Sequence, residues 1–204
     1  MSTEKTKKET RNFQHEVRSE EGSRHVEGYA LLFGVRSDGL WFDEVIERNA
    51  LDGVLEKSNV FALLNHDMSR GILARWNRKA ISLTLEVDEK GLRYSFDAPN
   101  TALGDELIES LRRGEINQSS FCFSAEKDTW EKKEDGNWKR TIHKIGQLYD
   151  VSPVYDAAYS STSVDLRGKE QVEAAIEAEK QAIEARAAKE LDEYYAKLNK
   201  TLFN

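Results

Sequence analysis

Apolar and polar residues alternate with a period of two over much of the chain between residues 25 and 151. The clearest alternation covers Ile81–Val87, and the polar turn Asp88–Gly91 leads from it into Leu92–Phe96. Alternation of this kind places apolar side chains on one face of a strand. The pattern therefore predicts a β-hairpin over residues 81–96.

Other short apolar runs, bounded by turn-forming residues, predict further strands. His25–Phe33 and Leu40–Ile46 read as a second hairpin, and Val60–Leu64 as a buried strand. Four more strands are expected at Ser119–Lys127, Trp130–Glu134, Trp138–Ile142 and Ile145–Val151, with a turn at residues 135–137.

One amphipathic helix interrupts these strands. Asn100 or Thr101 can cap it, and Gly114 can end it in a left-handed conformation. Its apolar face consists of Leu103, Leu107, Ile108 and Leu111. Many strands with few helices predict an α+β fold, mainly an antiparallel β-barrel or strongly curved sheet surrounded by a few helices.

The two ends of the chain differ from this central part. Residues 1–20 are polar and unpatterned, so we expect a disordered tail, with the globular domain covering residues 21–167. Residues 168–204 are rich in Glu, Ala, Lys and Gln, which predicts a charged helical arm. Its apolar stripe, partly broken by Lys180, consists of Val172, Ile176, Ile183, Ala187, Leu191, Tyr194 and Leu198. The stripe fits packing on its own domain as well as binding to a partner or to a second copy.

The composition of the chain argues against several classes of function. A net charge of -7 lacks the basic excess that nucleic-acid binding requires, and no apolar run approaches the length of a membrane span. The start of the chain does not resemble a secretion signal, so we expect a cytosolic protein. The single cysteine and the scattered histidines 15, 25, 66 and 143 offer no metal-ligand spacing. We expect neither a metal nor a cofactor.

The segment Gly114–Phe123 is the most informative for chemistry. Strand alternation puts Ser119 on one face with Phe121 and Phe123, and Ser120 on the other with Cys122. Since the phenylalanines prefer the core, Ser120 should face a groove or secondary cavity, where a nucleophile would be useful. The same residues are also compatible with two strand serines that have no catalytic role. Cys122 is an alternative nucleophile, although a lone cysteine is more often a small buried filler.

A serine nucleophile needs a base, and the base needs an acceptor that fixes its tautomer. His66 follows the strand at 60–64 and is the candidate base, although a single histidine there also fits a structural role. The candidates for the third group are Asp67, Asp150, Asp156 and His143. Asp67 is a chain neighbour of His66 and cannot easily reach its ring.

Five ordered blocks of residues resemble the prohead proteases of tailed phages with the HK97 type of capsid, over about residues 24–167. They are Glu27–Ala30 with Phe33, Leu63–Asp67, Asp88–Leu92, Gly114–Phe123, and Asp150–Val154 followed by Ala158-Tyr159. The family differs at two positions, because a glycine is common where this chain has Cys122 and a proline where it has Ala157.

The resemblance implies a serine endopeptidase with His66 as base and Ser120 as nucleophile. It favours Asp150 as the third residue, whereas the related herpesvirus assembly proteases use a second histidine and so keep His143 as an alternative. By the same analogy Arg167 is the candidate for oxyanion binding. The implied fold is the β-barrel with surrounding helices of those herpesvirus enzymes.

The implied substrates are scaffold or internal segments of capsid proteins and the protease itself, cleaved inside the assembling prohead in the host cytoplasm. Self-cleavage could remove the arm at 168–204, and the arm could support a homodimer. The alternative class is a non-enzymatic capsid scaffold or internal head protein that keeps the same fold.

Overall fold

The computed structural model describes residues 8–13, 17–19, 22–35, 40–77, 79 and 82–155, together with positions 174, 177, 178, 181, 185 and 189. The chain divides into two units, residues 1–161 and 162–204. In the second unit the six described positions have helical backbone and are exposed, and the Gln181 amide donates to Glu177 at 3.4 Å. Every residue of the expected apolar stripe lies outside the described residues.

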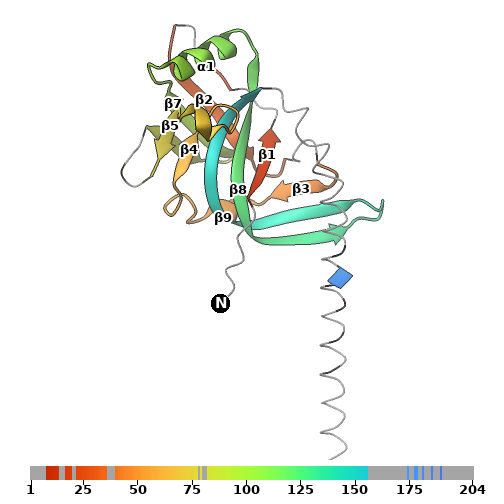
Figure 1. Ribbon diagram of the computed structural model, residues 1–204. Coiled ribbons are helices and arrows are strands. Elements are labelled where there is room, and N and C mark those ends of the chain that lie inside the picture. Colours follow the sequence, from red (N-terminus) through yellow and green to blue (C-terminus); the bar gives the residue numbers. More distant parts are fainter. Residues whose placement is uncertain are drawn as a thin grey trace, which may run out of the picture. The chain divides into compact units, whose positions relative to one another are not determined.

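The described residues of the first unit form two β-sheets (Figure 1). The larger has the strand order β1 (Glu9–Phe13), β8 (Ile116–Lys132), β9 (Trp138–Tyr155), β4 (Val60–Ala62) and β5 (Ala74–Trp76), and β3 (Asp43–Ile46) also pairs with β9. The smaller has the order β2 (His25–Leu32), β7 (Gly91–Asp97) and β6 (Leu83–Val87). The described helices are α1 (Ala102–Arg112) and the short 3-10 helices Arg48–Leu51 and Met68–Arg70.

The expected barrel is not formed among the described residues. β1 and β5 end the larger sheet, and β2 and β6 end the smaller one, so neither sheet closes on itself. The alternating sequence specifies strands with one buried face, and two open sheets packed face to face satisfy that requirement as well as a barrel does. The mixed α+β class, with mostly strands, is confirmed.

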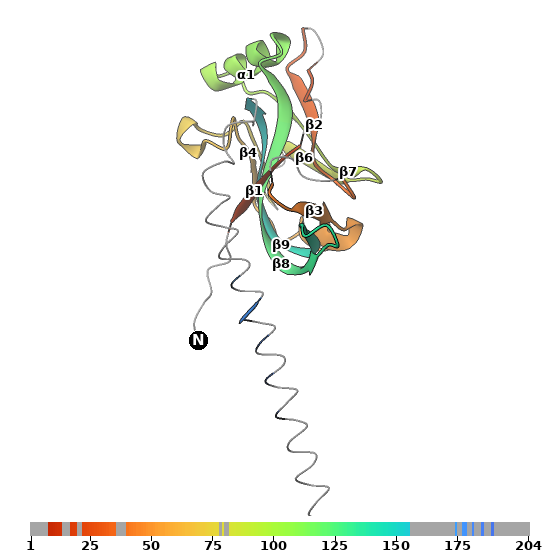
Figure 2. The ribbon, with the colours of Figure 1, turned by 90° about the vertical axis from the view of Figure 1, so that its right-hand side faces the viewer.

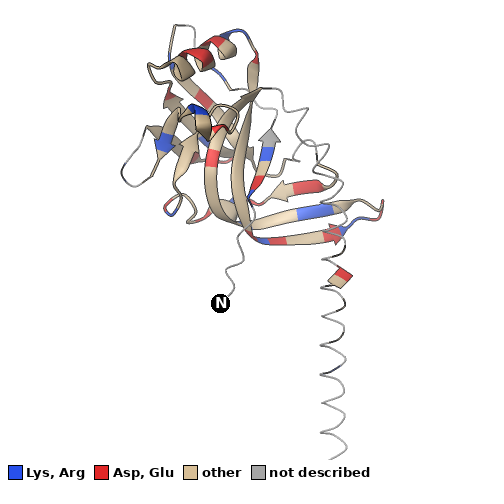
Figure 3. Ribbon diagram, in the orientation of Figure 1, with Lys and Arg blue, Asp and Glu red and all other residues tan. Residues whose placement is uncertain are grey.

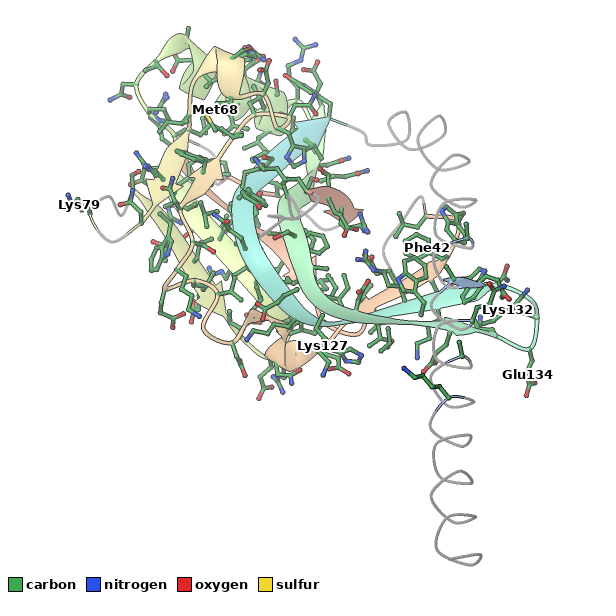
Figure 4. The ribbon with its side chains drawn as sticks, turned by 60° about the horizontal axis from the view of Figure 1, so that its bottom comes forward. Phe42, Met68, Lys79, Lys127, Lys132 and Glu134 are labelled. Carbon is green, nitrogen blue, oxygen red and sulfur yellow. The ribbon has the colours of Figure 1, made fainter. Side chains whose placement is uncertain are left out.

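The long antiparallel pair β8 and β9 forms the centre of the larger sheet. The four strands expected here are two continuous ones, with register shifts such as that between Lys127 and Asp128. Such bulges bend a strand pair without separating it. The expected turn is confirmed, with Gly136 at φ 83° and Asn137 N donating to Asp135 at 2.9 Å. The far end of the pair projects from the body, with Lys132 and Glu134 at its tip (Figure 4).

One expected hairpin is confirmed and the other is wrong. β6 and β7 pair across the turn with Val87 opposite Leu92. β2 instead pairs with β7, and β3 pairs in parallel with the distant strand β9. The reason lies in long-range partners that local alternation does not show, because the fully buried Glu44 of β3 binds Arg11 and Arg140.

Helix α1 forms as the sequence predicts and leads directly into β8 (Figure 2). The Thr101 hydroxyl accepts from Gly104 N at 3.3 Å, and Leu107 is buried in the core. Gly114 has φ 73° and ends the helix. This boundary fixes where β8 starts and therefore which of its residues face the core.

The core lies between the two sheets. Phe121 and Phe123 of β8 are fully buried and stack on one another at 4.9 Å. Gly28 of β2 faces Ser119 of β8 and Tyr94 of β7, and an added Cβ would lie 3.0 Å from Ser119 Oγ and from Tyr94 Oη. A glycine at this position therefore lets the sheets approach closely.

Within the N-terminal segment 1–20, for which the sequence predicts disorder, the structure describes a strand at residues 9–13. These form β1, which pairs antiparallel with β8. The β8 edge supplies backbone hydrogen bonds, and Arg11 forms a bidentate pair with Glu44 at 2.6 and 2.8 Å. Figure 3 shows charged positions on β1, β3 and β9, the strands that carry Glu9, Arg11, Glu44 and Arg140.

Candidate active site

The pleat of β8 separates its two adjacent serines, as strand alternation predicts. Ser119 Oγ lies in the core, 2.8 Å from the hydroxyl oxygen of buried Tyr94. Ser120 Oγ lies 2.5 Å from His66 Nε2. Only Ser120 therefore lies where a histidine can take its proton.

His66 reaches Ser120 from a tight turn after β4. Asn65 and His66 have positive φ angles of 54° and 61°, which are uncommon for residues with a side chain. The turn is tied to β9 because Asn65 N donates to the carbonyl of Pro153 at 3.0 Å. Strained backbone of this kind is kept where surrounding structure demands it, often at functional sites.

Asp150 lies on the far side of the imidazole. Its Oδ1 is 2.5 Å from His66 Nδ1, and the Ser152 hydroxyl donates to the same oxygen at 2.8 Å. β9 places Asp150 opposite Cys122 and Ser152 opposite Ser120. The structure thus brings Ser120, His66 and Asp150 into one continuous chain of hydrogen bonds.

Two of the alternative third residues, His143 and Asp67, do not join this chain. His143 lies 2.9 Å from Thr129 Oγ1 and 3.0 Å from Glu47 Oε2, so its ring is already engaged elsewhere. The Asp67 carboxylate accepts from the backbone and hydroxyl of Ser69. Asp156 and Arg167 lie outside the described residues.

Cys122 is a poor alternative nucleophile. Burial, followed by the charge of Asp150, raises the pKa of the Cys122 thiol. The thiolate is the reactive form, so a raised pKa lowers its population at neutral pH.

Within the described ranges, no group of three His, Cys, Asp or Glu side chains could hold a metal ion.

Comparison with known proteins identifies the family of this chain. The family model described as caudovirus prohead serine protease matches residues 13–177. The chain belongs to this family. Among solved structures, the capsid assembly protease gp21 of bacteriophage T4 is similar, with 11% identity, a TM-score of 0.44, and coverage of 72% of this chain and 98% of that chain. No curated protein matches the sequence.

Family membership makes the protein a phage prohead serine protease. Its described helices include none that is long and apolar enough to span a membrane. The distances among Ser120, His66 and Asp150 suit acyl transfer, in which a histidine activates a serine and a carboxylate orients the histidine.

The candidate nucleophile of this prohead protease is buried. Ser120 has no exposed surface, whereas the His66 side chain is 24% exposed. Ser120 Oγ also lies 2.9 Å from the backbone carbonyl of Arg11 in β1, with its hydroxyl as donor. A peptide backbone therefore already occupies the position next to the serine.

Sequence reasoning did not identify two of these contacts. Ser152 could have been found, because residues two apart in a strand share a face and Ser152 follows Asp150 by two. The Arg11 contact has no local signal, because it joins positions 109 residues apart.

Proposed function

We propose that this prohead protease cleaves scaffold or internal segments of capsid proteins, and itself, with Ser120 as nucleophile, His66 as base and Asp150 as the orienting acid. The observation that supports this proposal most directly is the hydrogen-bonded chain from Ser120 through His66 to Asp150. A serine hydroxyl becomes nucleophilic at neutral pH when such a base accepts its proton.

In the proposed reaction, Ser120 Oγ attacks a peptide carbonyl while His66 Nε2 takes the hydroxyl proton. Asp150 accepts the Nδ1 hydrogen bond and stabilises the imidazolium that forms. The imidazolium then donates its proton to the leaving amine, which gives an acyl-enzyme on Ser120. Water activated by His66 releases the acyl group and restores the serine.

The tetrahedral intermediate needs donors for its oxyanion. We propose backbone amides or an arginine for this role, with Arg167 as the candidate arginine. Its test is Arg167→Ala, which should lower kcat more than it raises KM, since oxyanion donors act mainly in the transition state.

The proposed site of action is the interior of the assembling prohead in the host cell, with the major capsid protein or scaffold as substrate. We propose that residues 21–167, extended by β1, form the protease domain. The arm at 168–204 is proposed to be helical, to associate with a partner helix or a second copy, and to contain a site of self-cleavage.

Intact mass spectrometry of wild type and Ser120→Ala, followed over hours after purification, tests the proposal. Mass loss from wild type alone supports serine-dependent self-processing and locates the cut. Ser119→Ala is the matched control and should be processed, since its hydroxyl faces the core. Equal trimming of wild type and Ser120→Ala would contradict the assignment of the nucleophile.

A serine-reactive fluorophosphonate probe distinguishes an active serine protease from the alternative, a non-enzymatic capsid scaffold or internal head protein. An enzyme should label at Ser120 in wild type and not in Ser120→Ala. A non-enzymatic scaffold would show neither mass loss nor labelling, even after assembly into proheads with the capsid protein.

A further inference from the structure

Strand β1 is an edge strand that runs beside the candidate nucleophile. It is five residues long, and Asn12 pairs with Ser120 in the antiparallel register. It lies at the end of the larger sheet, so its departure would leave the β8 and β9 pairing in place. The family match begins at residue 13, so almost all of β1 precedes the part that the family shares.

The contact with β1 competes with catalysis for a single proton. A serine hydroxyl has one hydrogen, and both His66 Nε2 at 2.5 Å and the Arg11 carbonyl at 2.9 Å lie within reach of Ser120 Oγ. When the hydrogen points to the Arg11 carbonyl, it is not available to the base. The carbonyl also fills space that a substrate carbonyl would need, because Ser120 is fully buried.

Side chains hold β1 in this position. Arg11 pairs with the fully buried Glu44, and Glu9 accepts from Arg140 at 2.5 and 2.9 Å. Buried bidentate pairs of this kind fix a strand's register as well as its position.

The same cluster allows β1 to leave. Without β1, Glu44 still accepts from Arg140 at 3.1 Å, and Arg140 still donates to Asp128 at 2.6 Å. Breaking a buried ion pair is costly when it leaves a buried charge without any partner. Glu44 of β3 and Arg140 of β9 each keep a partner when β1 leaves.

We infer that the edge of β8 beside Ser120 is the surface on which a substrate peptide binds as an added antiparallel strand, and that β1 blocks this surface until it is displaced. The inference rests on the proposed function. The partner is an extended peptide segment, because a strand edge recognises backbone amides and carbonyls with little regard to sequence.

A disulfide can lock β1 in place. Thr10 lies opposite Cys122 in the register, and Cys122 is the chain's single cysteine. Directly opposed residues of antiparallel strands have Cα separations of roughly 4.5–5.5 Å, within the range of about 4.4–6.8 Å that disulfides span. The Thr10→Cys variant should therefore form an intramolecular disulfide on oxidation and release it on reduction.

The readout is the rate at which a fluorophosphonate labels Ser120 in the full chain. Oxidised Thr10→Cys should label at least tenfold more slowly than the reduced form, while wild type should label equally under both conditions. Equal rates for the two forms of Thr10→Cys would overturn the inference and leave the proposed function intact. No labelling of any variant, including the Glu9→Ala variant that weakens the attachment of β1, would overturn the proposed function as well.

A second variant loosens β1. Glu9→Ala removes two ion pairs of β1 but leaves Arg11 and Arg140 paired with Glu44. It should label severalfold faster than wild type, whereas the exposed-site control Glu89→Ala should match wild type. Slower labelling of Glu9→Ala would show that β1 supports the site and would overturn the inference.

Discussion

The Ser152 hydroxyl donates to Oδ1 of Asp150 at 2.8 Å, and that same oxygen lies 2.5 Å from His66 Nδ1. Ser152 is fully buried. It is not one of the three residues, Ser120, His66 and Asp150, that form the hydrogen-bonded chain of the site. Its hydrogen bond restricts rotation of the carboxylate, so Ser152 is a positioning residue in the proposed mechanism.

Ser152→Ala should lower kcat about tenfold, equivalent to about 1.4 kcal/mol of barrier. KM should change little, because Ser152 orients the acid and does not contact the peptide in the proposed mechanism. Peptide hydrolysis kinetics measure both constants. Ser110→Ala, at a buried serine in α1, is the matched control, and a rise in KM alone would contradict the positioning role.

Asp150→Asn should lower kcat by about 10⁴-fold, since an amide cannot stabilise the imidazolium and favours the wrong tautomer. His143→Ala should retain wild-type kcat, because His143 contacts Thr129 and Glu47 instead of Ser120. Steady-state kinetics compare the two variants. The opposite ranking would assign the third position to His143.

Ser119→Ala and Tyr94→Phe should each cost about 1–3 kcal/mol of unfolding free energy, because each leaves a buried hydroxyl without its partner. The double variant should cost less than the sum of the two. Urea denaturation of the four proteins measures the coupling. Additive losses would mean that the 2.8 Å contact contributes nothing specific to stability.

Acid should weaken the attachment of β1 through Glu9. Burial opposes ionisation of Glu9, but hydrogen bonds and charge from Arg140, and then from Arg11, lower its pKa below the usual 4.5. A carboxyl with a lowered folded pKa stabilises the fold above its unfolded pKa, and this contribution is lost as the pH falls through the folded value.

Glu9→Gln should therefore be less stable than wild type by about 2 kcal/mol at pH 7. The difference should shrink as the pH falls below about 4.5. Urea denaturation across this range provides the measurement, with Glu89→Gln at an exposed turn as control. A difference that stayed constant with pH would exclude ionisation of Glu9 as its cause.

The parts of the fold that sequence predicted depend on neighbouring residues. Helix α1, the β6–β7 hairpin and the turn at Gly136 carry their signals within a few positions. The same period-two rule placed Ser120 and Ser119 on opposite faces. Geometry then brought together Ser120, His66 and Asp150, which the residues had offered only as candidates.

The missed features depend on partners far along the chain. β3 pairs in parallel with β9, almost a hundred residues later, because Glu44 meets Arg140. β1 forms because the edge of β8 offers it backbone partners and Glu44 offers Arg11 a charge. Polar composition alone predicts disorder for such a segment, since it contains too little apolar surface to fold by itself.

The position of β1 in the chain has a consequence for timing. Synthesis proceeds from the N-terminus, so β1 leaves the ribosome before His66, Ser120 and Asp150, and Asp150 is the last of these to be made. If β1 blocks the site as inferred, the blocking strand has always been synthesised by the time the proposed catalytic side chains are complete. A newly made protease would then reach the growing shell without having attacked its neighbours on the way.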